Sequence, residues 1–194
     1  MAKPRSYIER MVEQSSSPPV VTADELLHLH LPDKQTELVR GRLIVREPPS
    51  YGHGLAAGKL FTLIATHVRD RDLGAVFAAE TGFQLFSDPD TVRAADVAFI
   101  RRERLPDPPP VGYAALAPDL VVEVLSPNDR AGEVLNKVGD WLSAGSRLVW
   151  VIDTARRRAR VYRADGSESL LADQDALDGE DVLAGFSRAL TEVW

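Results

Sequence analysis

The alternation of apolar and polar residues predicts a chain in which strands alternate with two long helices. Apolar residues recur every three or four positions over 55–71 and 129–143, a spacing typical of amphipathic helices. This order indicates the α/β (α+β) class, with a mixed β-sheet flanked by helices. Shorter apolar runs bounded by turn residues predict strands at 37–45 (two strands turning near Gly41), 75–86, 92–100, 119–125, 147–152 and 158–163.

The first 21 residues differ in composition from the rest of the chain. Residues 15–19 are three serines followed by two prolines, a composition typical of linkers. Thr22 and Glu25 then form a capping-box pattern at the start of a short helix that Pro32 ends. We therefore expect residues 1–21 to be a flexible N-terminal extension. Residues 22–194 are expected to form a single domain, long enough to bury a sizeable core.

Two of the expected strands carry an acidic residue within an apolar run. Asp96 lies in residues 94–100, and Glu123 lies in residues 118–126. A carboxylate inside a buried strand is costly to desolvate unless another group pairs with it. If the two strands are neighbours, the two carboxylates can lie opposite each other, with Cβ atoms about 4.5–5.5 Å apart. That separation would let Asp96 and Glu123 share one Mg²⁺ or Mn²⁺ whose other ligands are water and substrate oxygens.

Lys137 lies where it could join these carboxylates. In its expected helix it follows Val134 by three residues and precedes Trp141 by four, so it shares the apolar, sheet-facing side. Its ammonium group could reach a phosphate or orient an attacking water. Together with a metal ion it would stabilise charge developing on phosphorus. Asp119 shares the face of Glu123, but we expect it only to begin the strand.

The composition limits the chemistry that the chain can perform. With no cysteine and four histidines, disulfides and thiolate metal sites are excluded, and a hard cation held by oxygen is favoured. The net charge of −6 provides no overall basic surface for nucleic acid, although it is compatible with a local basic groove. No segment is long and apolar enough to span a membrane, and the first 14 residues lack the apolar core of a secretory signal. We therefore expect a cytoplasmic protein.

Several sequence motifs together resemble one protein family. They are TADELL at 22–27, ELVRGRL at 37–43, His53 before a helix, ADVAFI at 95–100, PDLVVEVLSPND at 118–129, Lys137 and LVWVID at 148–153. In this combination the chain resembles the bacterial Uma-two family, within the PD-(D/E)XK nuclease superfamily. The resemblance implies a restriction-endonuclease-like fold. It also implies a Mg²⁺- or Mn²⁺-dependent endonuclease that hydrolyses the phosphodiester bonds of DNA.

The same resemblance implies roles for three residues. Asp96 takes the place of the motif aspartate and Glu123 that of the second acidic residue, so these two would be the metal ligands. Leu125 stands where the motif lysine is expected, and Lys137 resembles that lysine moved to the following helix. Ala95 stands where the family usually has proline. Neither departure removes a metal ligand.

His53 and Glu37 are auxiliary candidates, and each has an ordinary structural alternative. His53 could reach the site from the start of its helix, or it could cap a turn. Glu37 could orient a ligand, or it could pair with an arginine. Lys137 could equally be a helix lysine whose ammonium extends into solvent, and a strand carboxylate is often a salt-bridge partner.

Three functions are compatible with these patterns. The first is a metal-dependent DNA endonuclease, for which a homodimer is the expected assembly because nucleases that cut both strands often dimerise. The second is a catalytically inactive nuclease-fold module that binds nucleic acid or a protein partner. The negative net charge and the absence of a lysine at position 125 favour this alternative. The third is a structural dimerisation domain whose interface lies in the apolar strands near Trp194.

Overall fold

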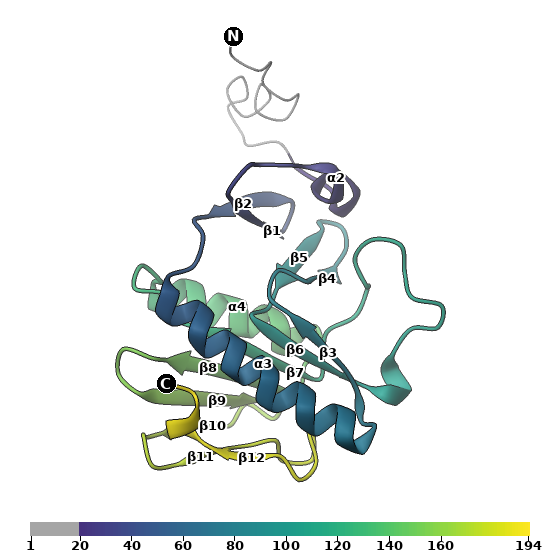
Figure 1. Cartoon of the computed structure of the whole chain (residues 1–194). Helices are drawn as coiled ribbons and strands as arrows, with labels where there is room; N and C mark the ends of the chain where they lie inside the picture. The colour runs from purple at the N-terminus through teal and green to yellow at the C-terminus, as the bar shows by residue number, and fades with distance from the viewer. Residues whose placement is uncertain (1–19) are drawn as a thin grey trace.

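The computed structural model describes residues 20–194. All but the last two residues of the expected extension, 1–21, therefore lie outside the described part of the chain. The described residues form two main β-sheets, a small two-stranded sheet and three α-helices (Figure 1). The helices are α2 (Ala23–His28), α3 (Tyr51–Arg71) and α4 (Ala131–Ser143). The expected α/β (α+β) class is confirmed.

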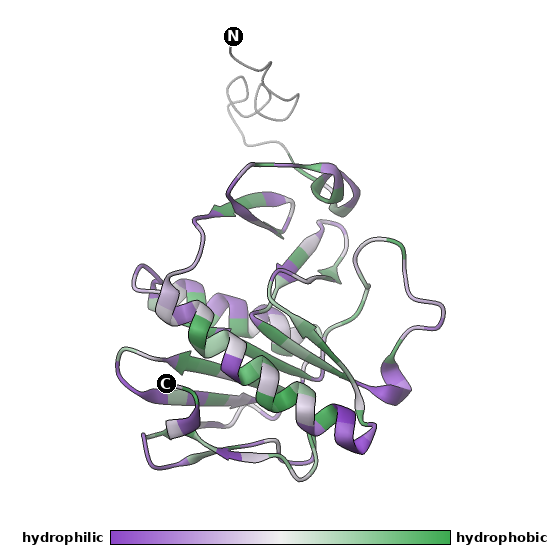
Figure 2. Cartoon of the chain, in the orientation of Figure 1, coloured by the Kyte–Doolittle hydropathy of each residue, from purple (hydrophilic) through white to green (hydrophobic). Residues whose placement is uncertain are grey.

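The six-stranded sheet forms the centre of the fold, in the order β10-β9-β8-β7-β6-β3. Strands β7 and β8 are parallel and every other neighbouring pair is antiparallel, so the sheet is mixed. Figure 2 shows its central strands coloured hydrophobic along most of their length. The bounds are β3 (Gly74–Ala78), β6 (Val97–Arg101), β7 (Leu120–Val124), β8 (Leu148–Asp153), β9 (Arg158–Arg163) and β10 (Glu168–Leu171).

Helices cover both faces of this sheet. Leu120, Val122 and Val124 belong to the core that α3 closes, together with the C-terminal segment. That segment contains β11 (Ala176–Asp178), β12 (Ser187–Ala189) and the 3-10 helix η2 (Leu190–Glu192). Val121 belongs to a second core against α4. Because alternate strand residues point to opposite faces, Glu123 points toward α4 with Val121, as the sequence predicted.

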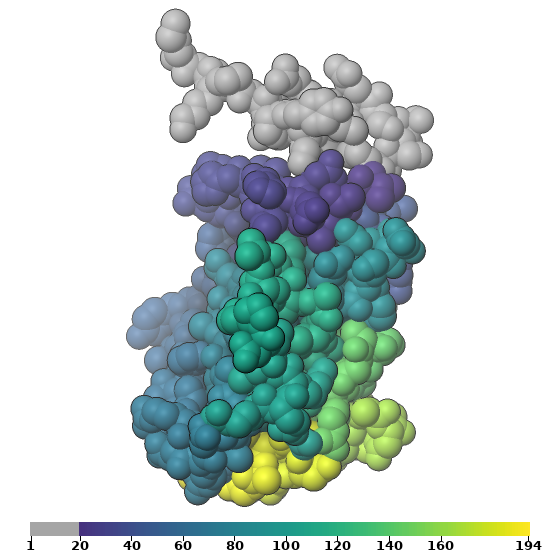
Figure 3. Space-filling view, turned by 90° about the vertical axis from the view of Figure 1, so that its right-hand side faces the viewer, coloured from purple at the N-terminus to yellow at the C-terminus, as the bar shows by residue number. Residues whose placement is uncertain are grey.

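The second main sheet has four strands in the order β2-β1-β5-β4 and packs against α2. Its strands are β1 (Gln35–Val39), β2 (Arg42–Arg46), β4 (Gly82–Phe86) and β5 (Thr91–Ala94). The long connection from the 3-10 helix η1 (Arg102–Arg104) to β7 runs over one side of the molecule (Figure 3). It is tied to β4 through a bridge between Ala114 and Phe83.

Two apolar runs that the sequence assigned to single strands are each divided between the sheets. Residues 92–100 form β5 in the four-stranded sheet and β6 in the six-stranded sheet, with a break at Ala95 and Asp96. Residues 75–86 divide in the same way into β3 and β4. The prediction of single strands was wrong because both sheets bury apolar side chains, so a chain that bends from one to the other keeps the same apolar pattern.

The helix ends also differ from the prediction. Helix α3 begins at Tyr51 rather than at residue 55, with the Ser50 hydroxyl accepting a hydrogen bond from His53 N. Glycines in its first turns, which weaken helix propensity, hid this start. Asp72, in the left-handed conformation, ends the helix, and β3 begins at Gly74. Residues 126–129 are a turn before α4, and α2 ends at His28. Among the described residues, no helix is long and apolar enough to cross a membrane.

Candidate active site

Asp96 and Glu123 lie side by side at the point where the chain passes from one sheet to the other. The register that pairs Val97 with Val122 places Asp96 opposite Glu123 when it is continued by one residue. Asp96 Oδ2 accepts a hydrogen bond of 2.6 Å from Val124 N. Both acids line a cavity of about 430 Å³. The break that divides residues 92–100 therefore turns a strand carboxylate toward an open space.

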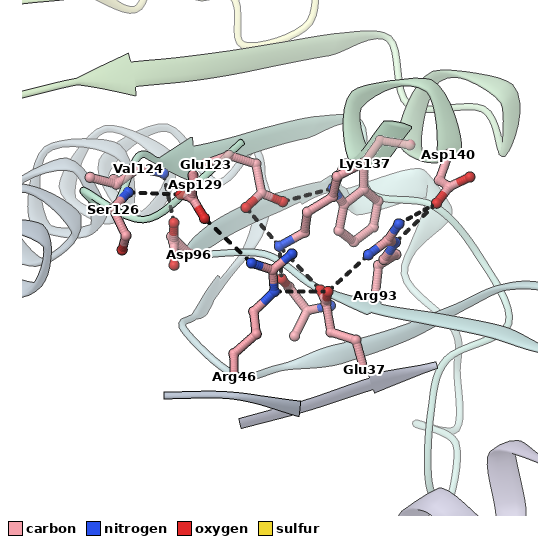
Figure 4. Close-up of polar contacts among 12 residues, drawn as sticks. Glu37, Arg46, Arg93, Asp96, Glu123, Val124, Ser126, Asp129, Lys137 and Asp140 are labelled. Carbon is pink, nitrogen blue, oxygen red and sulfur yellow. Dashed lines mark hydrogen bonds and ion pairs between the residues drawn. The ribbon is translucent and has the colours of Figure 1, made fainter. Parts of the chain in front are cut away.

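Donors on α4 hold both carboxylate oxygens of Glu123. Lys137 Nζ donates to Oε2 at 2.8 Å (Figure 4). Trp141 Nε1 donates to Oε1, also at 2.8 Å. Residues four apart on a helix lie on one face, so the spacing of Lys137 and Trp141 directs both donors at one carboxylate. The sequence placed Trp141 in the apolar stripe and missed its N–H as a donor.

The Lys137 ammonium group has three acceptors within reach. Besides Glu123 Oε2, it lies 2.8 Å from the Ala94 carbonyl oxygen and 3.1 Å from Glu37 Oε1. A protonated lysine has three N–H donors, so all three are engaged. The structure therefore places Lys137 among the carboxylates, with its side chain only 15% exposed, instead of extended into solvent.

The pKa values of Glu123 and Lys137 are both raised, but for different reasons. Burial raises the pKa of Glu123 to about 7, and the nearby carboxylates of Asp96 and Glu37 oppose the lowering effect of Lys137. Burial would lower the pKa of Lys137, but the surrounding carboxylates Glu123, Glu37 and Asp96 raise it above its ordinary value. Lys137 therefore keeps its proton at neutral pH, and Glu123 holds a proton to higher pH than an ordinary glutamate.

His53 reaches the site from the first turn of α3. Its Nε2 lies 3.2 Å from Asp96 Oδ2, and its buried Nδ1 has no partner among the described residues. Burial would lower the pKa of His53, but its hydrogen bond to Asp96 and the charge of that carboxylate raise it. His53 thus contacts a candidate ligand from inside the helix, not from a turn before it.

Glu37 belongs to a buried chain of ion pairs beside Lys137. It accepts hydrogen bonds from Arg93 Nη1 at 2.9 Å and from Ala94 N at 3.0 Å. Arg93 also donates from Nη2 to Asp140 at 2.6 Å. Burial would raise the pKa of Glu37, but the positive charges of Lys137 and Arg93 outweigh the effect of burial. They lower the pKa of Glu37 to about 2. Glu37 therefore pairs with an arginine, one of its two sequence interpretations, and it also lies beside Lys137. Its role in orienting a ligand stays a prediction.

Sequence reasoning missed Arg93 and Asp140, although both carried a signal. Arg93 is a charged residue inside an apolar strand, the same feature that pointed to Asp96 and Glu123. Asp140 follows Lys137 by three residues, so the two share a helix face. Asp119, by contrast, does not line the cavity. It accepts a hydrogen bond from Arg101 N and forms an ion pair with Arg104.

The carboxylates at the cavity set how a divalent cation could be held there. Across residues 20–194, no group of three or more histidine and carboxylate side chains is placed to hold a metal ion. Asp96 uses Oδ2 for its contacts, and its Oδ1 has no hydrogen-bond partner among the described residues. Mg²⁺ commonly takes one or two carboxylates and completes its shell with water and substrate oxygens. Asp96 and Glu123 supply two carboxylates, although both oxygens of Glu123 also accept hydrogen bonds from protein donors.

Comparison with known proteins places this geometry in a family. A model of the Uma2 family, described as "Putative restriction endonuclease", matches residues 23–191. The chain belongs to the Uma2 family. The family resemblance predicted from the sequence motifs is thereby confirmed, and membership of Uma2 supports a nuclease function.

The solved structure of another protein has the same fold. A protein from Anabaena variabilis ATCC 29413, described as "a putative nuclease belonging to DUF820", superimposes with a TM-score of 0.78. It is 19% identical, and the match covers 89% of this chain and 97% of that chain. At this identity the likeness establishes the restriction-endonuclease-like fold alone. The comparison with curated proteins produced no match.

Proposed function

We propose that this Uma2 protein is a Mg²⁺- or Mn²⁺-dependent endonuclease that hydrolyses DNA phosphodiester bonds at Asp96, Glu123 and Lys137. The observation that carries the proposal is the meeting of these three residues at one cavity. Lys137 Nζ lies 2.8 Å from Glu123, and Asp96 lies opposite Glu123 across the β6–β7 pair. Two carboxylates beside a protonated lysine favour binding of a cation and a phosphate together.

In this proposal each residue has a separate task. Asp96 and Glu123 would hold the cation, which when bound would activate a water and stabilise negative charge on the phosphate. Lys137 and Trp141 fix the two oxygens of Glu123. His53 and Val124 N orient Asp96. Glu37 holds Lys137 from its other side.

A nicking assay with supercoiled DNA tests the proposal. Wild type with Mg²⁺ or Mn²⁺ should convert supercoiled to open-circular DNA, and Asp96→Asn or Glu123→Gln should lower the rate about 100- to 1,000-fold. Asp119→Asn is the matched control, because Asp119 is a buried acid on the same face of the same strand segment. It should leave the rate unchanged. Equal rates for wild type and both site variants would contradict the proposal.

The second candidate is a catalytically inactive nuclease-fold module that binds nucleic acid or a protein partner. One observation favours it: both oxygens of Glu123 already accept hydrogen bonds from protein donors. Calorimetric titration of Mn²⁺ separates the candidates. Heat of binding in wild type that disappears in the Asp96→Asn/Glu123→Gln double variant supports the nuclease. DNA binding that persists without metal binding and without cleavage supports the module.

The remaining features of the proposal concern assembly and location. We propose a cytoplasmic protein whose residues 22–194 act as one domain. A homodimer would place two sites for cutting both strands of DNA. Sedimentation velocity tests the assembly, and a monomer at all accessible concentrations would contradict it.

A further inference from the structure

Arg46, at the end of β2, lies where three cavities meet. It lines the cavity of about 430 Å³ beside Asp96 and Glu123, a second cavity of about 170 Å³ that Lys137 also lines, and a groove of about 650 Å³ along α4. Among the described residues it alone lines all three. Figure 4 shows its side chain extending from β2 toward Asp129.

The guanidinium group of Arg46 has unused hydrogen-bonding capacity. Its Nη1 donates to Asp129 Oδ1 at 3.3 Å, and its buried Nε has no hydrogen-bond partner, with Glu37 Oε2 3.9 Å away. An arginine has five N–H donors. The side chains of Arg46 and Asp129 are 33% and 22% exposed, and a long, partly solvated ion pair contributes little stability. A better acceptor could therefore replace Asp129.

The other cations at the cavity are less available than Arg46. Lys137 uses its three donors on Glu123, Glu37 and the Ala94 carbonyl. His53 contacts Asp96. The cavity lining is rich in acid, and a phosphate there would need a positive group with free donors. The acidic residues that line it are Glu47, Asp96, Glu123, Asp129 and Glu133.

We propose that Arg46 binds a phosphate of the nucleic-acid backbone beside Asp96 and Glu123, with the phosphate replacing Asp129 as its partner. The planar guanidinium matches a phosphate through paired N–H donors, which a lysine cannot reproduce. The class of ligand rests on the proposed function, but binding by Arg46 does not require cleavage.

Fluorescence anisotropy of a short labelled DNA duplex, measured with EDTA over a series of salt concentrations, tests this assignment. Arg46→Ala should weaken binding about tenfold, as expected for one charge-assisted hydrogen-bonded contact. The slope of log affinity against log salt should fall by about one. Arg46→Lys should keep most of that slope but bind more weakly than wild type, because the charge remains and the paired donors do not.

Arg42 provides the matched control. It is the same residue type on the same strand, exposed, and lines none of the three cavities. Arg42→Ala should change the affinity less than twofold. Equal losses for Arg42→Ala and Arg46→Ala, or no loss for Arg46→Ala, would overturn the assignment. Failure of the wild type to bind the duplex would overturn it as well.

Asp129→Asn tests the exchange of partners without altering Arg46. The asparagine oxygen can still accept from Ser126 N, as Asp129 Oδ2 does at 2.7 Å, while the attraction for Arg46 is lost. The variant should bind the duplex more tightly than wild type, and weaker or unchanged binding would count against the exchange. Cleavage that is unaffected by Arg46→Ala would leave the proposed function intact while this inference fails. Conversely, if the predicted differences in DNA binding appear but no variant or wild type cleaves DNA, the inference about Arg46 stands and the proposed function fails.

Discussion

Asp119 directly precedes β7 and Glu123 lies near the end of that strand, on the same face, and both are buried acids. Each has one basic partner at 2.8 Å, Arg104 for Asp119 and Lys137 for Glu123. Their surroundings differ. Asp119 also accepts a hydrogen bond from Arg101 N and so ties the end of β6 to the residue before β7. Glu123 faces a cavity and lies among other carboxylates.

The difference shows what separates a structural acid from a candidate catalytic one. A buried acid needs only one good partner to be tolerated, and Asp119 has this in Arg104 together with a backbone N–H. Around Glu123 the fold instead gathers like charges, Asp96 and Glu37, and a single lysine contacts two of these three carboxylates. Such a concentration of charge at an opening is typical of functional sites.

The largest expected effect comes from breaking the charge network that supports Lys137. Arg93→Met leaves Glu37 and Asp140 buried without their shared cation, and should lower the free energy of unfolding by about 3–5 kcal/mol. Arg104→Met should cost only about 1–2 kcal/mol, because Arg104 is 36% exposed and Arg101 N still donates to Asp119. Urea unfolding followed by tryptophan fluorescence measures both. Equal losses would mean that the two acids are supported in the same way.

The next largest effect is a loss of folding stability at acid pH, caused by protonation of Glu37 at the site. Glu37 has a pKa of about 2 in the folded protein and 4.5 as its ordinary value. The unfolded chain therefore binds more protons in this range, and stability falls as pH drops from about 4.5 toward 2. The loss should reach about 3 kcal/mol. Unfolding of wild type and Glu37→Gln across this range checks it, and an identical pH dependence in the two proteins would refute it.

The smallest effect concerns the hydrogen bond from Trp141 to Glu123. Trp141→Phe removes that donor as well as some volume, whereas Trp150→Phe removes a buried N–H that has no partner. Trp141→Phe should therefore destabilise the protein by about 1–2 kcal/mol more than Trp150→Phe. Thermal and urea unfolding of the pair isolates the contribution of the bond, since both residues are fully buried. No difference would show that Glu123 does not depend on this donor.

The sequence alone determined the elements that carry the site and the residue types within them. Apolar periodicity located β7, β8, β9 and the two long helices to within a few residues. The same pattern marked Asp96 and Glu123 as unusual strand acids. Helical spacing placed Lys137 on the side of its helix that faces the sheet. These features are local, since strand and helix periods depend on residues close together in the chain.

Only the tertiary structure decided how these residues meet. The bend at Ala95 and Asp96, where the chain changes sheets, turns Asp96 toward the cavity, and an apolar pattern that suits both sheets cannot reveal it. Arg93 and Asp140 are 47 residues apart, and Trp141 and Glu123 are 18 apart. Such partners are brought together by packing between elements, which also sets the cavity that Arg46 borders. Contacts between distant segments depend on three-dimensional geometry that local sequence patterns do not specify.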